Sequence, residues 1–448
     1  MRALRQALRT HDSGWMRWLG ERGRVAILAE LSPKVVPRGG MATFTSTAVR
    51  AVLVCALLLG SVVACGDGSQ PLKVGLLLDY SEGSTEKARD RERAFDLAVQ
   101  HVNAAGGVLG RPVETVTRDS TRDPAVAVEE ARRMIEEEGI HALVGPNSSA
   151  NSLPVVEQVA GPAGIPVISP SASSPLLTNV ADNDFFFRTT LSDSSRGPVL
   201  AQVTRDLGFT NVGLVYRDDA WGRGIYESFA AAWTGPLRAV GLSPGQTTYL
   251  PELRETASGG AEALVVLTFE VEAAVAIREA VESGLYSRFM LGDALKSPAL
   301  GAAVGGALSG AYGTAGVAAP ESAAAAAWDA AFVAEYGNPP EYAYVRETYD
   351  AAIALALAAQ AAGSVDGAAI RDRLRGVGSG PGTVTAPTAA GVAEALRILG
   401  EGGAVDYEGA ATTMDWDDNG DLRRGHIGVW RFTDDGRIED LYAVRFDY

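Results

Sequence analysis

Short apolar runs rich in Val, Ile and Leu alternate along this chain with longer segments of helical periodicity, and this alternation constrains the fold more than any other feature. In the first half of the body the apolar runs are residues 73–78, 113–118, 141–144 and 166–169. Such runs, separated by helices, are typical of buried strands in a parallel sheet, because parallel neighbours need a crossover connection. The pattern therefore predicts an α/β fold.

The segments between these runs carry the start and stop signals of helices. One apolar face has the helical spacing i, i+3, i+4 and i+7, at Phe95, Ala98, Val99 and Val102. Residues 103–107 then supply the Asn and Gly residues that favour a helix C-cap. The next helix has Asp123 as its N-cap, Pro124 in its first turn and Gly139 at its end.

A comparable series begins again further along, with apolar runs at residues 211–216, 261–267 and 288–291 and helices from about 224 and around 273–283. A chain of 448 residues is too long for one ordinary core and suits two domains. The sequence therefore predicts two Rossmann-like lobes with parallel central sheets, joined by a hinge. The later segments complete both lobes; they are helices near 323–335 and 344–361, a mobile surface loop at 376–390 and a polar hairpin at 414–430.

Residues 41–65 have the order of a bacterial export signal: Arg50, a short apolar core, and then Val-Val-Ala-Cys65. The apolar core is too short to span a bilayer, for which a helix needs about 20 residues. Val-Val-Ala-Cys resembles a lipobox, so we expect Cys65 to be acylated and residues 66–71 to act as a tether. An ordinary secretory signal with an incidental Cys65 is the alternative. Residues 1–40 form an upstream extension outside the fold, since translation can start at Met41.

Charge and cysteine usage narrow the classes of function. The formal net charge is −16, which opposes binding to nucleic acid and to anionic lipid surfaces. Cys55 and Cys65 both lie in the leader, so the body has neither a disulfide framework nor a cysteine metal site. The four histidines show no HExxH or HxH spacing. We therefore expect no metal and no cofactor.

Two loops that follow predicted strands are rich in serine. They are residues 145–150, Gly-Pro-Asn-Ser-Ser-Ala, and 169–175, Ser-Pro-Ser-Ala-Ser-Ser-Pro. Ligands of open parallel sheets bind beyond the carboxyl ends of the strands, where hydroxyl groups and free N–H groups suit a carboxylate. The alternative is that these serines only cap helices.

Five segments together resemble a known family: NAAGGVLGRPVE, VGPNSSANS, GIPVISPSASSPLLT, DNDFFFRTTLSDSSRGPVLA and VGLVYRDDAWGRGIYESF. They look like the leucine/isoleucine/valine-binding family of type I periplasmic solute-binding proteins, which serve ABC importers. The resemblance extends from about residue 72 to the C-terminal hairpin. It implies a type I periplasmic-binding-protein fold with one lobe at 72–191 plus 320–409 and the other at 192–319 plus 410–448.

The resemblance also implies a ligand site. In this family two serine/threonine loops hold the carboxylate of an amino acid, and aromatic residues and a distal acid complete the site. Carried over by position, these residues are Ser149, Ser171 (through its backbone), Ser173, Trp221, Phe269, Asp293 and Tyr344. Trp221 stands where the family usually has Tyr, and Asp293 stands at the ammonium-binding position. Lys87 replaces an aromatic side chain of the branched-chain binders, which predicts a more polar pocket.

We therefore expect a monomeric, non-enzymatic lipoprotein on the outer face of a bacterial membrane, held there only by its lipid anchor. Its lobes would close on a small amino-acid-like ligand and deliver it to an ABC permease and ATPase complex. A ligand-sensing subunit of a signalling system is the alternative of the same fold. Ser84 and Lys87 spell the SxxK pattern of serine β-lactamases, but the chain has no SDN, KTG or GxSxG companion motif. An EF-hand-like run also occurs, and a hairpin turn explains it; its residues are Asp415, Asp417, Asn419 and Gly420.

Overall fold

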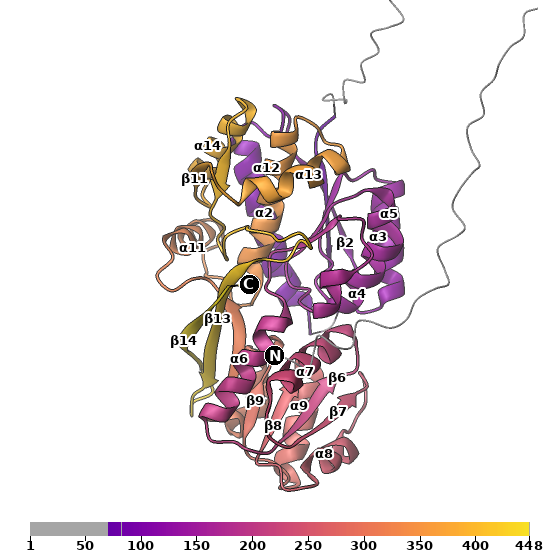
Figure 1. Cartoon of the computed structure of the whole chain (residues 1–448), viewed down its shortest axis with the longest axis vertical. Coiled ribbons are helices and arrows are strands. Elements are labelled where there is room, and N and C mark those ends of the chain that lie inside the picture. Colours follow the sequence, from indigo (N-terminus) through magenta and orange to yellow (C-terminus); the bar gives the residue numbers. More distant parts are fainter. Residues whose placement is uncertain (1–69, 82, 448) are drawn as a thin grey trace, which may run out of the picture. The chain divides into compact units, whose positions relative to one another are not determined.

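The computed structural model describes residues 70–81 and 83–447. The predicted signal peptide, Cys65 and residues 1–40 lie outside the described residues and stay predictions. Two separate large sheets with helices around them form the described part of the chain (Figure 1). The predicted α/β architecture with two mainly parallel sheets is thereby confirmed.

The first sheet has five strands, all parallel, in the order β2-β1-β3-β4-β5. They are β1 (Lys73–Leu78), β2 (Glu114–Asp119), β3 (Ala142–Val144), β4 (Val167–Ser169) and β5 (Phe186–Arg188). Because successive side chains point to opposite faces, Leu76 of β1 packs into one core and Leu77 into another. Both faces of the central strands are thus buried, which explains their continuous apolar sequence.

Helices cover both faces of this sheet, and together they form the first lobe. The face of the sheet that carries the Leu76 side chain, here called the Leu76 face, packs on five helices. They are α2 (Thr85–Ala104), α11 (Ala323–Tyr336), α12 (Val345–Ala362), α13 (Gly367–Val377) and α14 (Ala389–Gly400). The Leu77 face packs on α3 (Pro124–Glu136) and α4 (Ser149–Val155). The predicted start of α3 is confirmed, since Asp123 accepts a 2.9 Å hydrogen bond from the Ala125 N–H.

One helix pair of the first lobe has the apolar composition of a membrane segment. No single helix of the described residues is long and apolar enough to cross a membrane, whereas α12 and α13 meet that composition together and are bent by 109°. In the structure α12 is a core helix, with most of its residues buried against the first sheet.

The second sheet has seven strands in the order β14-β13-β10-β9-β8-β6-β7, and with its helices it forms the second lobe. Its parallel strands are β6 (Val212–Arg217), β7 (Leu237–Leu242), β8 (Ala263–Leu267), β9 (Phe289–Leu291) and β10 (Tyr312–Val317). An antiparallel hairpin, β13 (Arg424–Phe432) and β14 (Ile438–Asp447), extends one edge. One face is covered by α6 (Asp193–Asp206) and α7 (Ala220–Ala232), and the other by α8 (Leu250–Ala257), α9 (Glu270–Glu282) and α10 (Pro298–Val304).

The chain passes between the two lobes three times, after β5, after β10 and before β13. The assignment of residues 72–191 plus 320–409 and 192–319 plus 410–448 to the lobes stays a prediction. Met414, Trp416 and Leu422 pack in the core of the first lobe. The Trp416 indole N–H also donates a 2.8 Å hydrogen bond to the Arg188 carbonyl, so the polar hairpin before β13 rests on β5.

Two local expectations are wrong. Strand β2 was expected to be buried, but it is largely exposed because it lies at the edge of its sheet. The predicted loop 376–390 contains strand β11 (Thr383–Thr385), which pairs with β12 (Val405–Tyr407), and α14 begins at its end. The sequence of β11 is Thr-Val-Thr, which lacks the apolar run that predicted the equally short strands β3, β4 and β9.

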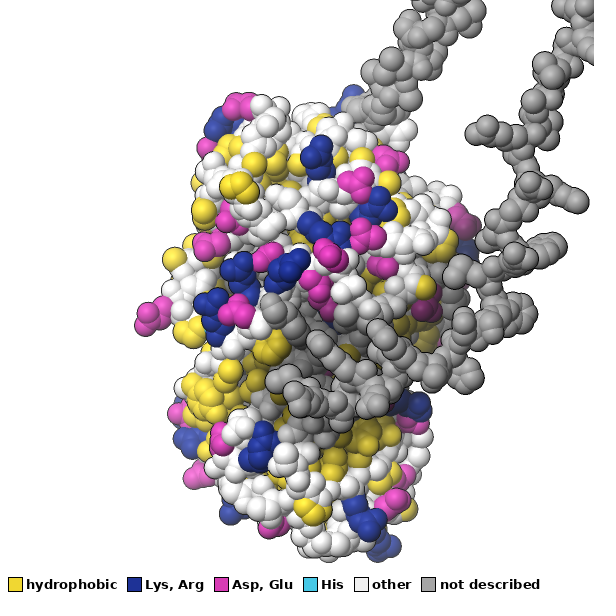
Figure 2. Space-filling view, in the orientation of Figure 1, with side chains coloured by type: hydrophobic (Ala, Val, Ile, Leu, Met, Phe, Trp, Pro, Cys, Tyr) yellow, Lys and Arg dark blue, Asp and Glu magenta, His cyan; other side chains and the backbone are white. Residues whose placement is uncertain are grey.

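Charged side chains of both signs are interspersed over the face of the molecule seen in Figure 2. Many form exposed ion pairs, such as Arg397 with Glu394 at 2.8 Å. Pairs of this kind add little to stability, so the cores of the two lobes carry the fold.

Candidate functional site

A cavity of about 120 Å³ lies where the carboxyl ends of strands from both sheets meet. Because a single water needs about 10–15 Å³ measured in the same way, this space suits one small molecule. Asp79 follows β1, Arg217 ends β6 and Phe269 follows β8, so the wall is built from loops of both lobes. This is the position at which open parallel sheets bind their ligands.

The structure brings most of the predicted site residues to this cavity. Those that line it are Ser149, Ser171, Trp221, Phe269, Asp293 and Tyr344. Ser173 is not among the residues that line it, and its ligand-binding role stays a prediction. It is fully buried, and its hydroxyl donates a 2.8 Å hydrogen bond to Asp193 at the start of α6. Ser173 therefore joins two elements and leaves its hydroxyl unavailable to a ligand.

The loop after β3 is held tightly against the first sheet. Gly145 has φ of 107°, and a Cβ there would lie 2.2 Å from the Leu77 carbonyl oxygen, so only glycine allows this approach. The Asn147 side-chain oxygen then accepts a 2.9 Å hydrogen bond from the Asp79 N–H. The loop is thus fixed before it reaches its serines.

The serines of the two loops divide between capping and lining roles. Ser148 caps α4 by accepting a hydrogen bond from the Asn151 N–H at 3.3 Å. Ser149 follows at the cavity wall, where its oxygen accepts a 3.1 Å hydrogen bond from the Ser174 N–H. Ser171 donates to the Asn147 carbonyl at 2.7 Å. The hydroxyl proton of Ser149 and the lone pairs of Ser171 therefore remain for a ligand.

Asp293 lies opposite, on the second lobe, and is held through one of its two oxygens. Arg196, buried in α6, bridges Asp293 at 2.9 Å and Asp193 at 2.6 Å, and the Tyr344 hydroxyl also donates to Asp293. The other oxygen, Oδ1, is buried and has no hydrogen-bond partner among the described residues. Burial raises the pKa of Asp193 to about 6 although Arg196 lowers it, and burial raises the pKa of Tyr344 well above its usual value. Asp293, which lines the cavity, therefore has one acceptor oxygen that the described residues leave without a hydrogen-bond partner.

An aromatic plate forms part of the second-lobe wall. The rings of Trp221 and Phe269 stack with centroids 5.0 Å apart and planes at 16°. The Arg217 guanidinium lies 4.8 Å from the Phe269 ring centroid and forms an ion pair with Asp219 at 2.7 Å. Asp219 in turn caps α7 by accepting from the Trp221 backbone N–H, which fixes the start of the helix that carries the indole. The plate is thus rigid and offers an apolar surface beside charged groups.

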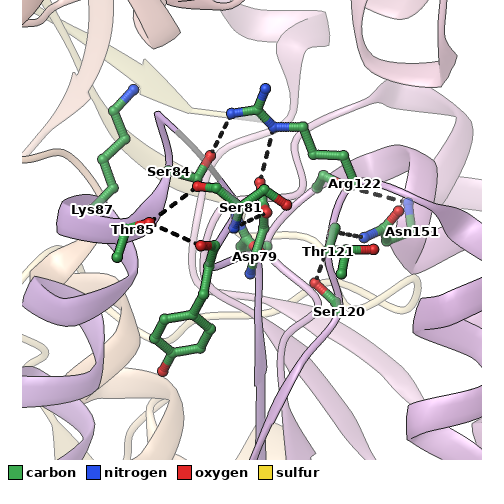
Figure 3. Close-up of polar contacts among 12 residues, drawn as sticks. Asp79, Ser81, Ser84, Thr85, Lys87, Ser120, Thr121, Arg122 and Asn151 are labelled. Atoms are coloured by element: carbon green, nitrogen blue, oxygen red, sulfur yellow. Dashed lines mark hydrogen bonds and ion pairs between the residues drawn. The ribbon is translucent and has the colours of Figure 1, made fainter.

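Lys87 was expected in the pocket from the resemblance, whereas the other charged residues of the wall except Asp293 were not predicted. Arg122 donates hydrogen bonds to Asp79 at 3.2 Å and to the Ser84 hydroxyl at 2.9 Å, as Figure 3 shows. Lys87, whose side chain is directed away from this cluster in Figure 3, forms a 2.9 Å ion pair with Glu270 of the second lobe. The signal available in the sequence was the i, i+4 spacing of Lys87 and Arg91 on one face of a helix, since both line the cavity.

Comparison with known proteins shows the family of this chain. Residues 71–395 match the family model described as periplasmic binding protein. The chemotactic signal transduction system substrate-binding protein BasB of Halobacterium salinarum is 28% identical over 77% of this chain and 83% of that protein. Leu/Ile/Val-binding protein homolog 1 of Brucella abortus is 26% identical over 71% of this chain and 86% of that protein.

A solved structure shows the same fold. The branched-chain amino acid transporter substrate-binding protein LivJ of Streptococcus pneumoniae, in complex with isoleucine, is similar with a TM-score of 0.70. The identity is 23%, and the match covers 84% of this chain and all of that one. The chain therefore belongs to the type I periplasmic binding proteins, the family that contains the Leu/Ile/Val-binding proteins.

Proposed function

We propose that this protein is the extracytoplasmic solute-binding component of an ABC importer, and that it captures an amino acid or a similar small polar carboxylate. The observation that carries the proposal is that Asp293, whose buried Oδ1 atom has no hydrogen-bond partner among the described residues, lines the same small cavity as Ser149 and Ser171. A buried acceptor without a donor is costly, so a ligand ammonium is its natural partner. A carboxylate suits this wall, where the Ser149 hydroxyl retains its proton as a donor and Ser171 is expected to donate through its backbone N–H.

Closure of the lobes follows from where these groups sit. The serines belong to the first lobe, whereas Asp293, Trp221 and Phe269 belong to the second. A ligand docked on the serines reaches the second set only when the lobes approach. Ligand binding therefore favours the closed state by the contacts that only this state provides.

The ion pair between Lys87 and Glu270, both of which line the cavity, joins the two lobes. Their side chains are 22% and 15% exposed, and burial lowers the pKa of Lys87 while Glu270 raises it. In a double-mutant cycle of Lys87→Gln and Glu270→Gln, we expect a coupling free energy of about 1 kcal/mol in ligand affinity, measured by calorimetry. The exposed second-lobe pair Arg223 and Asp218 serves as the control cycle and should show no coupling. Additive effects of the two substitutions would contradict a closing role.

The proposed function is tested by a thermal-shift screen of the twenty L-amino acids, their amides and small carboxylates, followed by calorimetry. A ligand at 100 times its Kd should stabilise the folded chain by about 2.7 kcal/mol. Ser149→Ala should weaken the response, because it removes a donor to the ligand. If no L-amino acid or small carboxylate shifts the unfolding temperature, the proposed function is wrong.

A sensory role is the second candidate, because the similar protein from Halobacterium salinarum is named as part of a chemotactic signal transduction system. Crosslinking in membranes distinguishes the two roles. A permease partner supports import, and a receptor partner supports sensing. Both roles keep the same ligand site.

Catalysis by the SxxK pattern finds no support in the contacts of its residues. The Ser84 hydroxyl accepts a hydrogen bond from Arg122, and Lys87 is paired with Glu270. A serine nucleophile needs a base within hydrogen-bond reach, whereas Ser84 is bonded to Arg122 and Lys87 to Glu270. Binding without catalysis is therefore part of the proposal, together with export, the lipid anchor at Cys65 and a monomeric state.

A further inference from the structure

Arg91 of α2 lines the cavity and has an unusual set of partners. Its side chain is buried, with 8% of its surface exposed. Its Nε and Nη2 atoms both donate to the Ala343 carbonyl, at 3.4 and 3.3 Å, and the guanidinium lies 5.5 Å from the Tyr344 ring centroid. Within the part of the chain that the structure describes, no carboxylate approaches it within 4.0 Å.

The other cations that line the cavity each have a carboxylate partner. Lys87 pairs with Glu270 at 2.9 Å, Arg122 with Asp79 at 3.2 Å, Arg217 with Asp219 at 2.7 Å and Lys296 with Asp440 at 2.6 Å. A buried charge without a counter-ion destabilises a folded protein strongly. Two long hydrogen bonds to one carbonyl do not replace a counter-ion. The missing partner of Arg91 is therefore best supplied by the ligand.

The distribution of charge over the two walls also indicates that the ligand supplies the partner of Arg91. On the first lobe the described lining residues are three cations, Lys87, Arg91 and Arg122, against one carboxylate, Asp79. On the second lobe they are two cations against three carboxylates, Asp219, Glu270 and Asp293. The first wall thus favours the more negative end of a ligand, and the second wall favours an ammonium.

We infer that the ligand is an acidic amino acid, or another small molecule with one ammonium and two acidic groups, and that Arg91 is the counter-ion of its second acidic group. This inference rests on the proposed function and deepens it. A neutral amino acid provides partners for the serines and Asp293 but leaves Arg91 without a carboxylate within 4.0 Å among the described residues. A ligand with a second carboxylate provides partners for the serines, Asp293 and Arg91.

The experiment is calorimetry on the full chain with L-glutamate, L-aspartate, L-glutamine, L-asparagine and L-leucine, with O-phospho-L-serine to separate a phosphate from a carboxylate. The parent protein should bind one of the acidic compounds at least about tenfold more tightly than its amide, because the amide leaves the guanidinium unpaired. Arg91→Gln should weaken binding of that acid by at least about 30-fold and leave the amide nearly unchanged.

Two further variants separate recognition from structure. Arg89→Gln is the matched control, because Arg89 lies on the same helix, is 57% exposed and pairs with Glu86. It should keep the parent's preference. Arg91→Lys, which retains the charge, should recover part of the preference for the acid.

The outcomes distinguish this inference from the proposed function. If amides or leucine bind as tightly as the acids, or if Arg91→Gln weakens both equally, the acidic ligand is wrong while amino-acid binding stands. If none of these compounds binds but another amino acid of the thermal-shift screen does, the acidic ligand is wrong, and if no compound of that screen binds the parent protein, the proposed function itself fails.

Discussion

Replacing Arg188 with methionine is expected to destabilise the folded chain by about 3 to 5 kcal/mol, the cost of leaving one charge of a buried pair without its partner. Arg188 ends β5 and is fully buried. Its Nε and Nη2 atoms each lie 2.6 Å from one oxygen of Asp421, in a bidentate ion pair. The same guanidinium donates to the Ser174 carbonyl at 3.0 Å and to the Thr178 hydroxyl at 2.9 Å. Its loss would leave these buried acceptors, which lie between β4 and α6 and in the hairpin before β13, without their donor.

The measurement is urea unfolding of the parent and the variant. Arg431→Met is the matched control, because Arg431 is 41% exposed in its pair with Glu439 and should cost less than about 1 kcal/mol. A combined Arg188→Met and Asp421→Leu variant should recover part of the loss, since it removes both charges. An Arg188→Met protein as stable as the Arg431→Met control would show that the pair does not hold this region.

Much of the strand framework was predictable because local physics determines it. Strand β1 was predicted at residues 73–78 and lies there, since an apolar run between turn residues has few other ways to be buried. Strand β2 was placed to within a residue, but its burial was wrong because edge position depends on strand order, which no local pattern contains. Its polar sequence, Glu-Thr-Val-Thr-Arg-Asp, was the available sign of an edge.

The site was predictable only in part, and the resemblance supplied most of it. Ser149, Ser171 and Asp293 were carried over by position and do line one cavity, although their binding roles stay predictions. The ionic network was missed because its partners are far apart in sequence; Arg188 and Asp421, for example, are 233 residues apart. Ser173 contacts Asp193 of α6 and does not line this cavity, because spacing cannot tell which serine of a loop faces the cavity and which faces a helix.

Replacing Asp293 with asparagine is expected to weaken ligand binding by about 2 to 5 kcal/mol, which is about 30-fold to several thousand-fold in Kd. The carboxylate is 5% exposed, and its free Oδ1 is the proposed partner of the ligand ammonium. Asparagine keeps the size of the side chain but removes the charge. The asparagine amide also places its N–H₂ group either beside the ammonium or beside the Arg196 and Tyr344 donors. Both contacts are unfavourable because a donor then faces a donor.

Calorimetry with the amino acid that the screen selects measures this loss, and the carboxylic acid that lacks only the amino group provides the second arm. That analogue should bind the parent weakly and should lose little further affinity in Asp293→Asn, because it has no ammonium to lose. Asp218→Asn is the matched control, since Asp218 is 38% exposed in its pair with Arg223 on the same lobe and should bind like the parent. If Asp293→Asn weakened the amino acid and the analogue by the same factor, Asp293 would support the cavity wall through Arg196 and Tyr344, and the ammonium would have to bind elsewhere.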